Sequence, residues 1–180
     1  FKKATGSFVL SDGTALTDVG YLEIGGSVTS AFAGVGGIGF ELSDVSFAIV
    51  MVSDTKGTAV TTDDVNYMAL KADVASAALV GIDGLTAQIT SLSVEVNNTS
   101  DTVSPNRVLD FSGANSRDVA TGPAGSPVVT IDIDGAEGVV LSVQTAIALD
   151  VFGFVQLDGS LAFKKATGSF VLSDGTALTD

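Results

Sequence analysis

The sequence contains no cysteine, no histidine and no tryptophan. The lack of cysteine excludes disulfides, thiolate metal sites and cysteine nucleophiles. The lack of histidine removes the commonest general base and the commonest transition-metal ligand. A hydrolase made from the remaining residue types would need a carboxylate pair or a Ser–Lys pair, and no spacing in the chain selects one. We therefore expect that the protein is not an enzyme.

Basic residues are also scarce. Eight Lys and Arg residues stand against 21 Asp and Glu residues, which gives a net charge of −13. Because nucleic-acid binding depends on basic patches, we expect no nucleic-acid partner. The chain is apolar, with 46% hydrophobic residues and a mean hydropathy of +0.48. No uninterrupted apolar run reaches the length of a membrane-spanning helix, so we expect no transmembrane segment.

One segment of the sequence occurs twice. Residues 1–18 read FKKATGSFVLSDGTALTD, and residues 163–180 repeat them without a substitution, at an offset of 163 − 1 = 162 residues. A fixed internal period is typical of repeat architectures, in which each unit packs on the next. We interpret residues 1–162 as one full unit and residues 163–180 as the start of the next identical one. An engineered self-overlap is the alternative interpretation.

Alternation of apolar and polar residues predicts long β-strands. It runs from Val139 to about Phe163, with a hairpin or bulge expected at Asp158-Gly159. Shorter stripes with the same period run from Tyr21 to Val28, from Val45 to Met51 and from Leu92 to Val96. Residues 73–79 could form a short helix, but the flanking pattern favours a strand. Residues 100–127 hold all three prolines and are predicted to be a surface excursion and a contact loop.

These patterns predict an all-β fold. We expect an elongated tandem-repeat array of long strands, either a wide β-solenoid or a stacked two-sheet fibre. Continuation of the sheets from unit to unit would protect their open edges. A string of separate β-sandwich domains is the alternative.

Acidic residues around a glycine turn form the best candidate metal site. Asp132, Asp134 and Glu137 offer the hard oxygen ligands that calcium prefers, although an EF-hand would need more of them. The segment Gly36–Leu42 resembles one calcium-binding nonapeptide, but a single copy cannot build a shared cage. Asp63-Asp64 is better interpreted as a solvated turn. Lys71 could form an isopeptide bond with an asparagine, which would require a buried carboxylate.

Several segments resemble a known class of repeat. YLEIGGSVTSAFAG (residues 21–34), LSVEVNN (92–98), VLDFSGAN (108–115) and LDVFGFVQLDGSLAFKK (149–165) are similar to modules of giant tandem-repeat bacterial proteins that are secreted or exposed at the cell surface. The resemblance implies an adhesin-like, extracellular or cell-surface protein. Many members are loosely described as calcium-binding, but the nonapeptide arrays that often accompany them are absent here.

The sequence therefore favours a structural or adhesive repeat of an extracellular filament. Such a protein would associate with itself through adjacent repeats and could contact a cell surface or matrix. The alternative is a binding module or conduit for apolar, lipid-like ligands along a β groove. Phe152 and Phe154 support it, because they place apolar side chains on the second face of a strand that is already apolar on its first. A continuous, unfilled apolar groove would favour the conduit, and a packed core would favour the filament.

Overall fold

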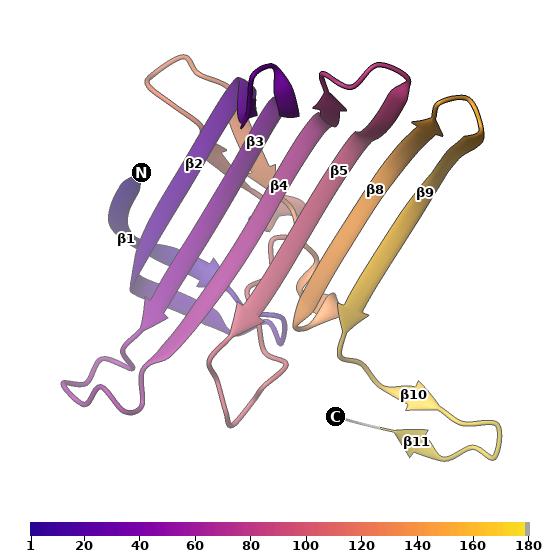
Figure 1. Ribbon diagram of the computed structural model, residues 1–180. Coiled ribbons are helices and arrows are strands. Elements are labelled where there is room, and N and C mark those ends of the chain that lie inside the picture. Colours follow the sequence, from indigo (N-terminus) through magenta and orange to yellow (C-terminus); the bar gives the residue numbers. More distant parts are fainter. Residues whose placement is uncertain (179–180) are drawn as a thin grey trace.

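A computed structural model describes residues 1–178. The fold is all-β, as predicted, with one large antiparallel sheet of seven strands in the order β1-β2-β3-β4-β5-β8-β9 (Figure 1). The strands are β1 (Lys2–Val9), β2 (Ala15–Val35), β3 (Ile38–Asp54), β4 (Val65–Val80), β5 (Leu85–Thr99), β8 (Val140–Val151) and β9 (Val155–Ala166). Each neighbouring pair is antiparallel, and most of these strands are far longer than an ordinary strand.

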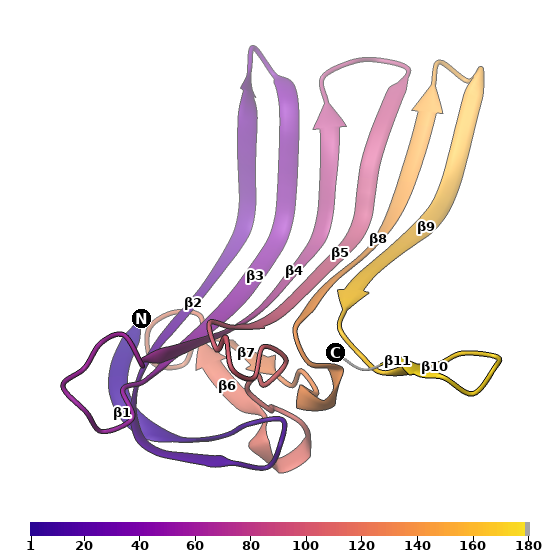
Figure 2. The ribbon, with the colours of Figure 1, turned by 90° about the horizontal axis from the view of Figure 1, so that it is seen from below.

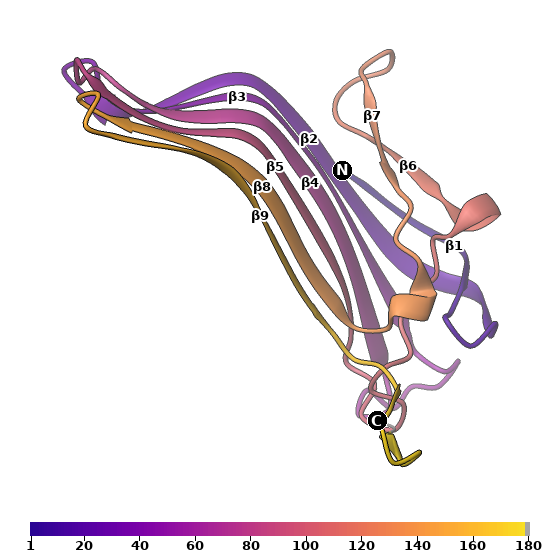
Figure 3. The same ribbon diagram turned by 90° about the vertical axis from the view of Figure 1, so that its right-hand side faces the viewer.

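The chain between β5 and β8 forms a cap, which we define as residues 100–139. The cap contains a hairpin of β6 (Arg117–Ala120) and β7 (Val128–Ile131), and two 3₁₀ turns, Gly113–Asn115 and Gly135–Glu137. It covers one face of the large sheet at one end of the strands, beside β1 (Figures 2 and 3). We call this the proximal end, and the opposite end, with the β2–β3 turn, the distal end.

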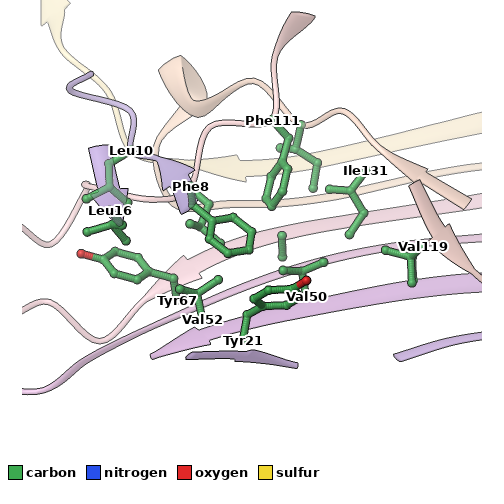
Figure 4. Close-up of a cluster of buried hydrophobic side chains, with 14 of the residues drawn as sticks. Phe8, Leu10, Leu16, Tyr21, Val50, Val52, Tyr67, Phe111, Val119 and Ile131 are labelled. Atoms are coloured by element: carbon green, nitrogen blue, oxygen red, sulfur yellow. The ribbon is translucent and has the colours of Figure 1, made fainter. Parts of the chain in front are cut away.

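The hydrophobic core lies between the cap and the proximal end of the sheet. Phe8 packs edge-to-face on Tyr21 and on Phe111, with ring centroids 5.3 and 6.4 Å apart. The same cluster contains these buried side chains from the β1–β2 hairpin, the central strands and the cap (Figure 4): Leu10, Leu16, Val50, Val52, Tyr67, Leu109, Val119 and Ile131. The core is therefore confined to one half of the sheet.

The large sheet bends about halfway along its strands. Asp44 in β3 has a left-handed φ of 47°, and its neighbours Ser43 and Val45 are paired to β4 while Asp44 is not. At the same level, the pairing of β5 with β8 shifts by one residue between Ile89 and Ser91. Such irregularities bend a strand. The sheet curves so that the cap lies on its convex side and the opposite face is concave (Figure 3).

Several sequence predictions about local structure are confirmed and others are wrong. Residues 73–79 lie in strand β4, as the flanking pattern favoured. Pairs that contain glycine also predict turns at Asp12-Gly13, Gly36-Gly37 and Asp83-Gly84, which are present, and at Gly25-Gly26, which is wrong because both residues lie inside β2. Asp158-Gly159 does not divide the Val139–Phe163 segment, because both residues lie inside β9. The hairpin turns instead at residues 152–154, where Phe152 has a left-handed φ of 50° and Gly153 one of 72°.

Residues 100–127 are also more than a surface excursion. Val108, Leu109 and Phe111 are fully buried, and Leu109 forms a β-bridge with Leu10. The amide of Asp110 donates to the Val9 carbonyl at 2.8 Å. This short apolar stretch fastens the cap to the β1–β2 hairpin, which is why the sequence places it within an otherwise polar, proline-containing segment.

Candidate functional site: the repeat junction and the concave face

The duplicated segment occupies two different environments. In the first copy Phe8, Leu10 and Leu16 are 7%, 1% and 7% exposed, because the cap covers them. In the second copy the equivalent Phe170, Leu172 and Leu178 are 67%, 45% and 49% exposed. Their hairpin, β10 (Phe170–Val171) with β11 (Ala177–Leu178), stands apart from the sheet beyond β9 (Figures 1 and 2).

The second copy nevertheless has the local structure of the first. Phe8 pairs with Leu16 and Val9 with Ala15. Phe170 pairs with Leu178 and Val171 with Ala177, in the same register. The hairpin therefore forms from local sequence alone, with a turn at Asp174-Gly175 that matches Asp12-Gly13. What the second copy lacks is a cap.

The beginning of the duplicated segment shows two different strand neighbours. In the first copy Lys2, Lys3 and Ala4 pair with Glu23, Leu22 and Tyr21 of β2. In the second copy the equivalent residues 164–166 pair with Ser142, Leu141 and Val140 of β8. β1 and β9 form opposite edges of the sheet (Figure 1). The same stretch thus pairs with β2 on one side and with β8 on the other.

Ion pairs at the two edges are complementary. Lys2 Nζ lies 3.8 Å from the buried carboxylate of Glu23, which also binds the Arg117 guanidinium. In the second copy Lys164 Nζ lies 2.6 Å from the Glu137 carboxylate of the preceding cap. The hydroxyl of Thr167 donates to Asn106 Oδ1 of the same cap at 2.6 Å. The second copy is therefore anchored to the cap that precedes it.

The face opposite the cap is largely apolar from one end of the strands to the other. β8 and β9 pair in one unbroken register, so the odd-numbered residues from Leu141 to Val151 share one face of the sheet. This is the concave face, since the even-numbered Val140 and Ser142 are buried on the capped side. Cross-strand partners extend it in rows, such as Leu149-Ala87-Leu79-Phe40-Ala33 and Leu141-Val96-Leu70-Ile49-Ile24.

Most of the concave face is half-buried even though no segment of residues 1–178 covers it. Leu70, Val94 and Ile147 have intermediate exposure, as do Asp73 and Ala148 on the other face of the same strands. A carbon atom added at Gly26 would lie only 2.6 Å from the Phe47 ring, which shows how closely this ring lies over the neighbouring strand. We call this curved and largely apolar face, which crosses all the long strands, the trough (Figure 3).

Charges are segregated between the two faces. Six carboxylates of the strands belong to rows that end on even-numbered β8 residues, which places them on the convex face: Glu23, Glu41, Asp73, Glu95, Asp150 and Asp158. On the concave face the charged residues are Lys3, which pairs with Leu22, and Lys165, which pairs with Leu141. Every other basic side chain within residues 1–178 forms an ion pair, and these two do not.

The proximal end of the concave face forms a shallow pocket with an amphipathic lining. Most of its surface is apolar, with Leu22, Met51 and Met68 among the apolar side chains that line it. Lys3 and several hydrogen-bonding residues also line it, namely Ser53, Thr55, Asn66, Asn98, Thr99 and Ser100. The proximal end of the face therefore stays largely apolar but gains a cation and hydrogen-bonding groups.

Each of the predicted calcium ligands contacts a different partner within the protein. Asp132 pairs with Lys71 Nζ at 2.6 Å, and Glu137 pairs with Lys164. Asp134 Oδ1 accepts the backbone amide of Ala136 at 2.9 Å, at the start of a 3₁₀ turn. The described part of the chain contains no group of three or more carboxylates placed to hold a metal ion. The geometry gives the calcium prediction no support.

Lys71 has carboxylate neighbours and no asparagine among its bonded partners. Burial alone would lower the pKa of its amine, but the hydrogen bond and charge of Asp132 and the charge of Glu95 outweigh burial and raise that pKa. Lys71 Nζ is 3.7 Å from Glu95 Oε1. A raised pKa keeps the amine protonated and therefore a poor nucleophile, which disfavours an isopeptide bond.

Carboxylates inside the cap fix its loops. Asp101 accepts the amides of Ser104 and Val103 and binds Arg107, at 3.0, 2.9 and 2.6 Å. The Ser104 amide, followed by Arg107, holds the pKa of Asp101 below its ordinary value, against the opposing effect of burial. Burial would raise the pKa of Asp110, but the amides of Ser112 and Gly135 outweigh it and lower that pKa.

Sequence reasoning found the apolar stripes but missed the face they build together. The apolar positions change phase within single strands: Val45 and Phe47 are odd-numbered, whereas Phe40 and Leu42 on the other side of Asp44 are even-numbered. A phase change of this kind signals a bulge and a bend. Lys3 and Lys165 gave no signal, because their isolation from carboxylates depends on strand register.

No protein-family model, no curated protein and no solved structure matches the chain. Within the described residues, no helix is long and apolar enough to cross a membrane.

Proposed function

We propose that the chain is a sheet-forming unit of an elongated tandem-repeat array with a structural, non-catalytic role. The observation that carries this proposal is the duplicated segment, whose apolar side chains are buried by a cap in one copy and uncovered in the other. A following unit would supply the missing cap. Phe170, Leu172 and Leu178 would then be buried as Phe8, Leu10 and Leu16 are.

Sheet continuation is the mechanism we infer for joining the units. The segment Phe163–Ala166 pairs with β8 and leaves its other edge open, and in the first copy that other edge pairs with β2. In an array, β9 of one unit and β1 of the next would be one strand with neighbours on both sides. Lys164 would then pair with Glu137 of its own unit's cap and, like Lys2, with a Glu23 equivalent in the next unit.

This arrangement removes both open edges of each inner unit, and such edges otherwise invite aggregation. The seven strands of the sheet, with one shared, leave 7 − 1 = 6 strands per unit. At about 4.8 Å between strands, each unit would lengthen the array by about 29 Å. The net charge of −13 keeps such an array hydrated and repels other copies. An extracellular, adhesin-like setting follows from the sequence resemblance alone.

Small-angle X-ray scattering from chains of one, two and three units tests the proposal. The one-unit chain is residues 1–180, which is one unit plus the start of the next, and each additional unit adds a copy of residues 1–162. We expect the maximum dimension to grow by about 29 Å per unit, with the scattering of a stiff rod. Separate sandwich domains on flexible links would instead give a flexible string with larger increments, and that outcome would refute sheet continuation.

A second function, binding of apolar ligands along the trough, is supported by a separate observation. The concave face is continuous, apolar and uncovered by residues 1–178, even though the convex face at the proximal end has a packed core. In an array the troughs of adjoining units would align. Phe152 and Phe154, which first suggested this function, lie at an exposed hairpin turn and are not part of the argument.

A further inference from the structure

We propose that the concave face binds the acyl chains of an anionic phospholipid, with the head group at Lys3 and at its copy, Lys165. This inference deepens the apolar-ligand function and does not depend on array formation. The evidence comes from the shape of the face, the length of its apolar part and the position of its two unpaired cations.

Curvature argues against a second copy as the occupant. Two sheets that pack face to face must interdigitate their side chains at a spacing of about 10 Å. Two concave faces touch at their rims and leave a space between them. The half-buried side chains of Phe47 and Val94 are three residues from Asp44 and Ser91, where the strands are irregular and such a space would be deepest. Flexible acyl chains can fill a curved trough, whereas a second rigid sheet of the same curvature cannot.

The length of the apolar surface suits acyl chains. From Leu141 to Val151 the concave side of β8 extends over ten residue steps, or about 33 Å at about 3.3 Å per residue. One leaflet of a bilayer has a hydrocarbon thickness of about 15 Å, half of the ~30 Å core. A lipid chain could therefore lie along the strands, on side chains that are all apolar in β8 except Thr145, with its head group at the proximal end.

The charge pattern selects an anionic head group. Lys3 lines the proximal pocket next to Leu22, Met51 and Met68, together with hydrogen-bonding side chains such as Asn98. It has no carboxylate partner in a protein whose acidic residues outnumber its basic ones by 21 to 8. The strand carboxylates lie on the opposite face. An exposed lysine next to apolar surface, free of ion pairs, complements a lipid phosphate.

The test uses the chain of residues 1–180 and phosphatidylglycerol, with phosphatidylcholine of the same acyl chains as the neutral comparison. Binding is measured by equilibrium partition of radiolabelled lipid from dilute detergent micelles. We expect phosphatidylglycerol to bind about five- to tenfold more tightly than phosphatidylcholine, and the double variant Lys3→Glu/Lys165→Glu to abolish this preference. Equal binding of the two lipids would overturn the head-group assignment.

Substitutions on adjacent β8 residues test the face itself. Leu149→Asp places a charge in the trough, whereas Ala148→Asp places the same charge one residue away on the convex face. We expect more than a tenfold loss of lipid binding for the first and little change for the second. Leu157→Asp, on the exposed strand β9, repeats the test where folding is least at risk. Circular dichroism checks that each variant keeps its strand content.

Two further results would overturn the proposal. One is lipid binding that neither Leu149→Asp nor Leu157→Asp weakens. The other is concentration-dependent dimerisation in sedimentation velocity that these variants abolish while lipid does not bind, which would make a second copy the occupant. Because all measurements use a single unit, neither result bears on sheet continuation, which the scattering series tests independently.

Discussion

Substituting the equivalent phenylalanine in each copy of the duplicated segment separates the effect of burial on stability from the effect of local sequence. Phe8 and Phe170 have identical neighbours for at least seven residues on either side. Phe8 packs against Tyr21 and Phe111 under the cap, and Phe170 is mostly exposed. Any difference between Phe8→Ala and Phe170→Ala must therefore come from tertiary contacts.

The expected magnitudes follow from the two environments. Truncating a buried phenylalanine to alanine costs about 3–5 kcal/mol, because both the transfer energy and the cavity count against the folded state. An exposed position changes stability by no more than about 0.5 kcal/mol. In the chain of residues 1–180, Phe8→Ala should therefore lower the free energy of unfolding by several kcal/mol, and Phe170→Ala should leave it nearly unchanged.

In a chain of two units, the expected loss of stability changes at position 170 but not at position 8. When residues 1–162 are followed by residues 1–180, a second cap covers the hairpin at the junction. Phe→Ala at the eighth residue of that second unit should then cost about 3–5 kcal/mol, like Phe8→Ala in the first. Urea unfolding followed by tyrosine fluorescence is suitable, since Tyr21 and Tyr67 both lie in the core. If the junction substitution stays neutral, the hairpin is not recapped and our account of the array is wrong.

Three further predictions concern the cap and its attachment. Arg117→Met leaves the buried Glu23 carboxylate without its closest partner, and we expect a loss of about 2–4 kcal/mol in urea unfolding, less than for a fully buried pair because Arg117 is partly exposed. Folding lowers the pKa values of Asp101 and Asp110, so their carboxylates stabilise the folded state. This contribution should be complete above about pH 5 and should disappear as the pH falls through the folded-state pKa values. An Asp101→Asn variant should therefore show a flatter dependence of melting temperature on pH. Gly25→Ala should destabilise by about 1–3 kcal/mol, because its methyl group would meet the Ala120 carbonyl oxygen at 2.3 Å, whereas Gly20→Ala, with no atom within 4 Å, should be tolerated.

The sequence was sufficient for the strands because their signals are local. Alternation from Tyr21 to Val28 and from Leu92 to Val96 predicts strands that are present in β2 and β5. Glycine turns at residues 12–13, 36–37 and 83–84 were also predictable, since left-handed backbone at these positions favours glycine. The prediction of a turn at Asp158-Gly159 was wrong because strand pairing of β9 with β8 outweighed a weak local preference for a turn.

The placement of the cap could not be predicted, because it depends on contacts between distant residues. Leu109 and Phe111 look like a short strand in a polar segment, and only the bridge to Leu10 shows that they close the core. The predicted metal ligands do not form one site, and this too depends on contacts between distant residues. Asp132 and Glu137 are near one another in sequence, but each pairs with a lysine from a different strand, Lys71 of β4 and Lys164 of β9.

The two halves of the sheet are stabilised differently. Under the cap, core packing holds the strands together, whereas in the distal half the strands are held by cross-strand pairs. Cross-strand pairs contribute roughly 0.2–1 kcal/mol each, far less than buried core residues. The distal half therefore gains most from any partner that covers its concave face or pairs with its edge. Sheet continuation supplies the edge partner and acyl chains supply the covering, so the two proposals address different deficits of one unit.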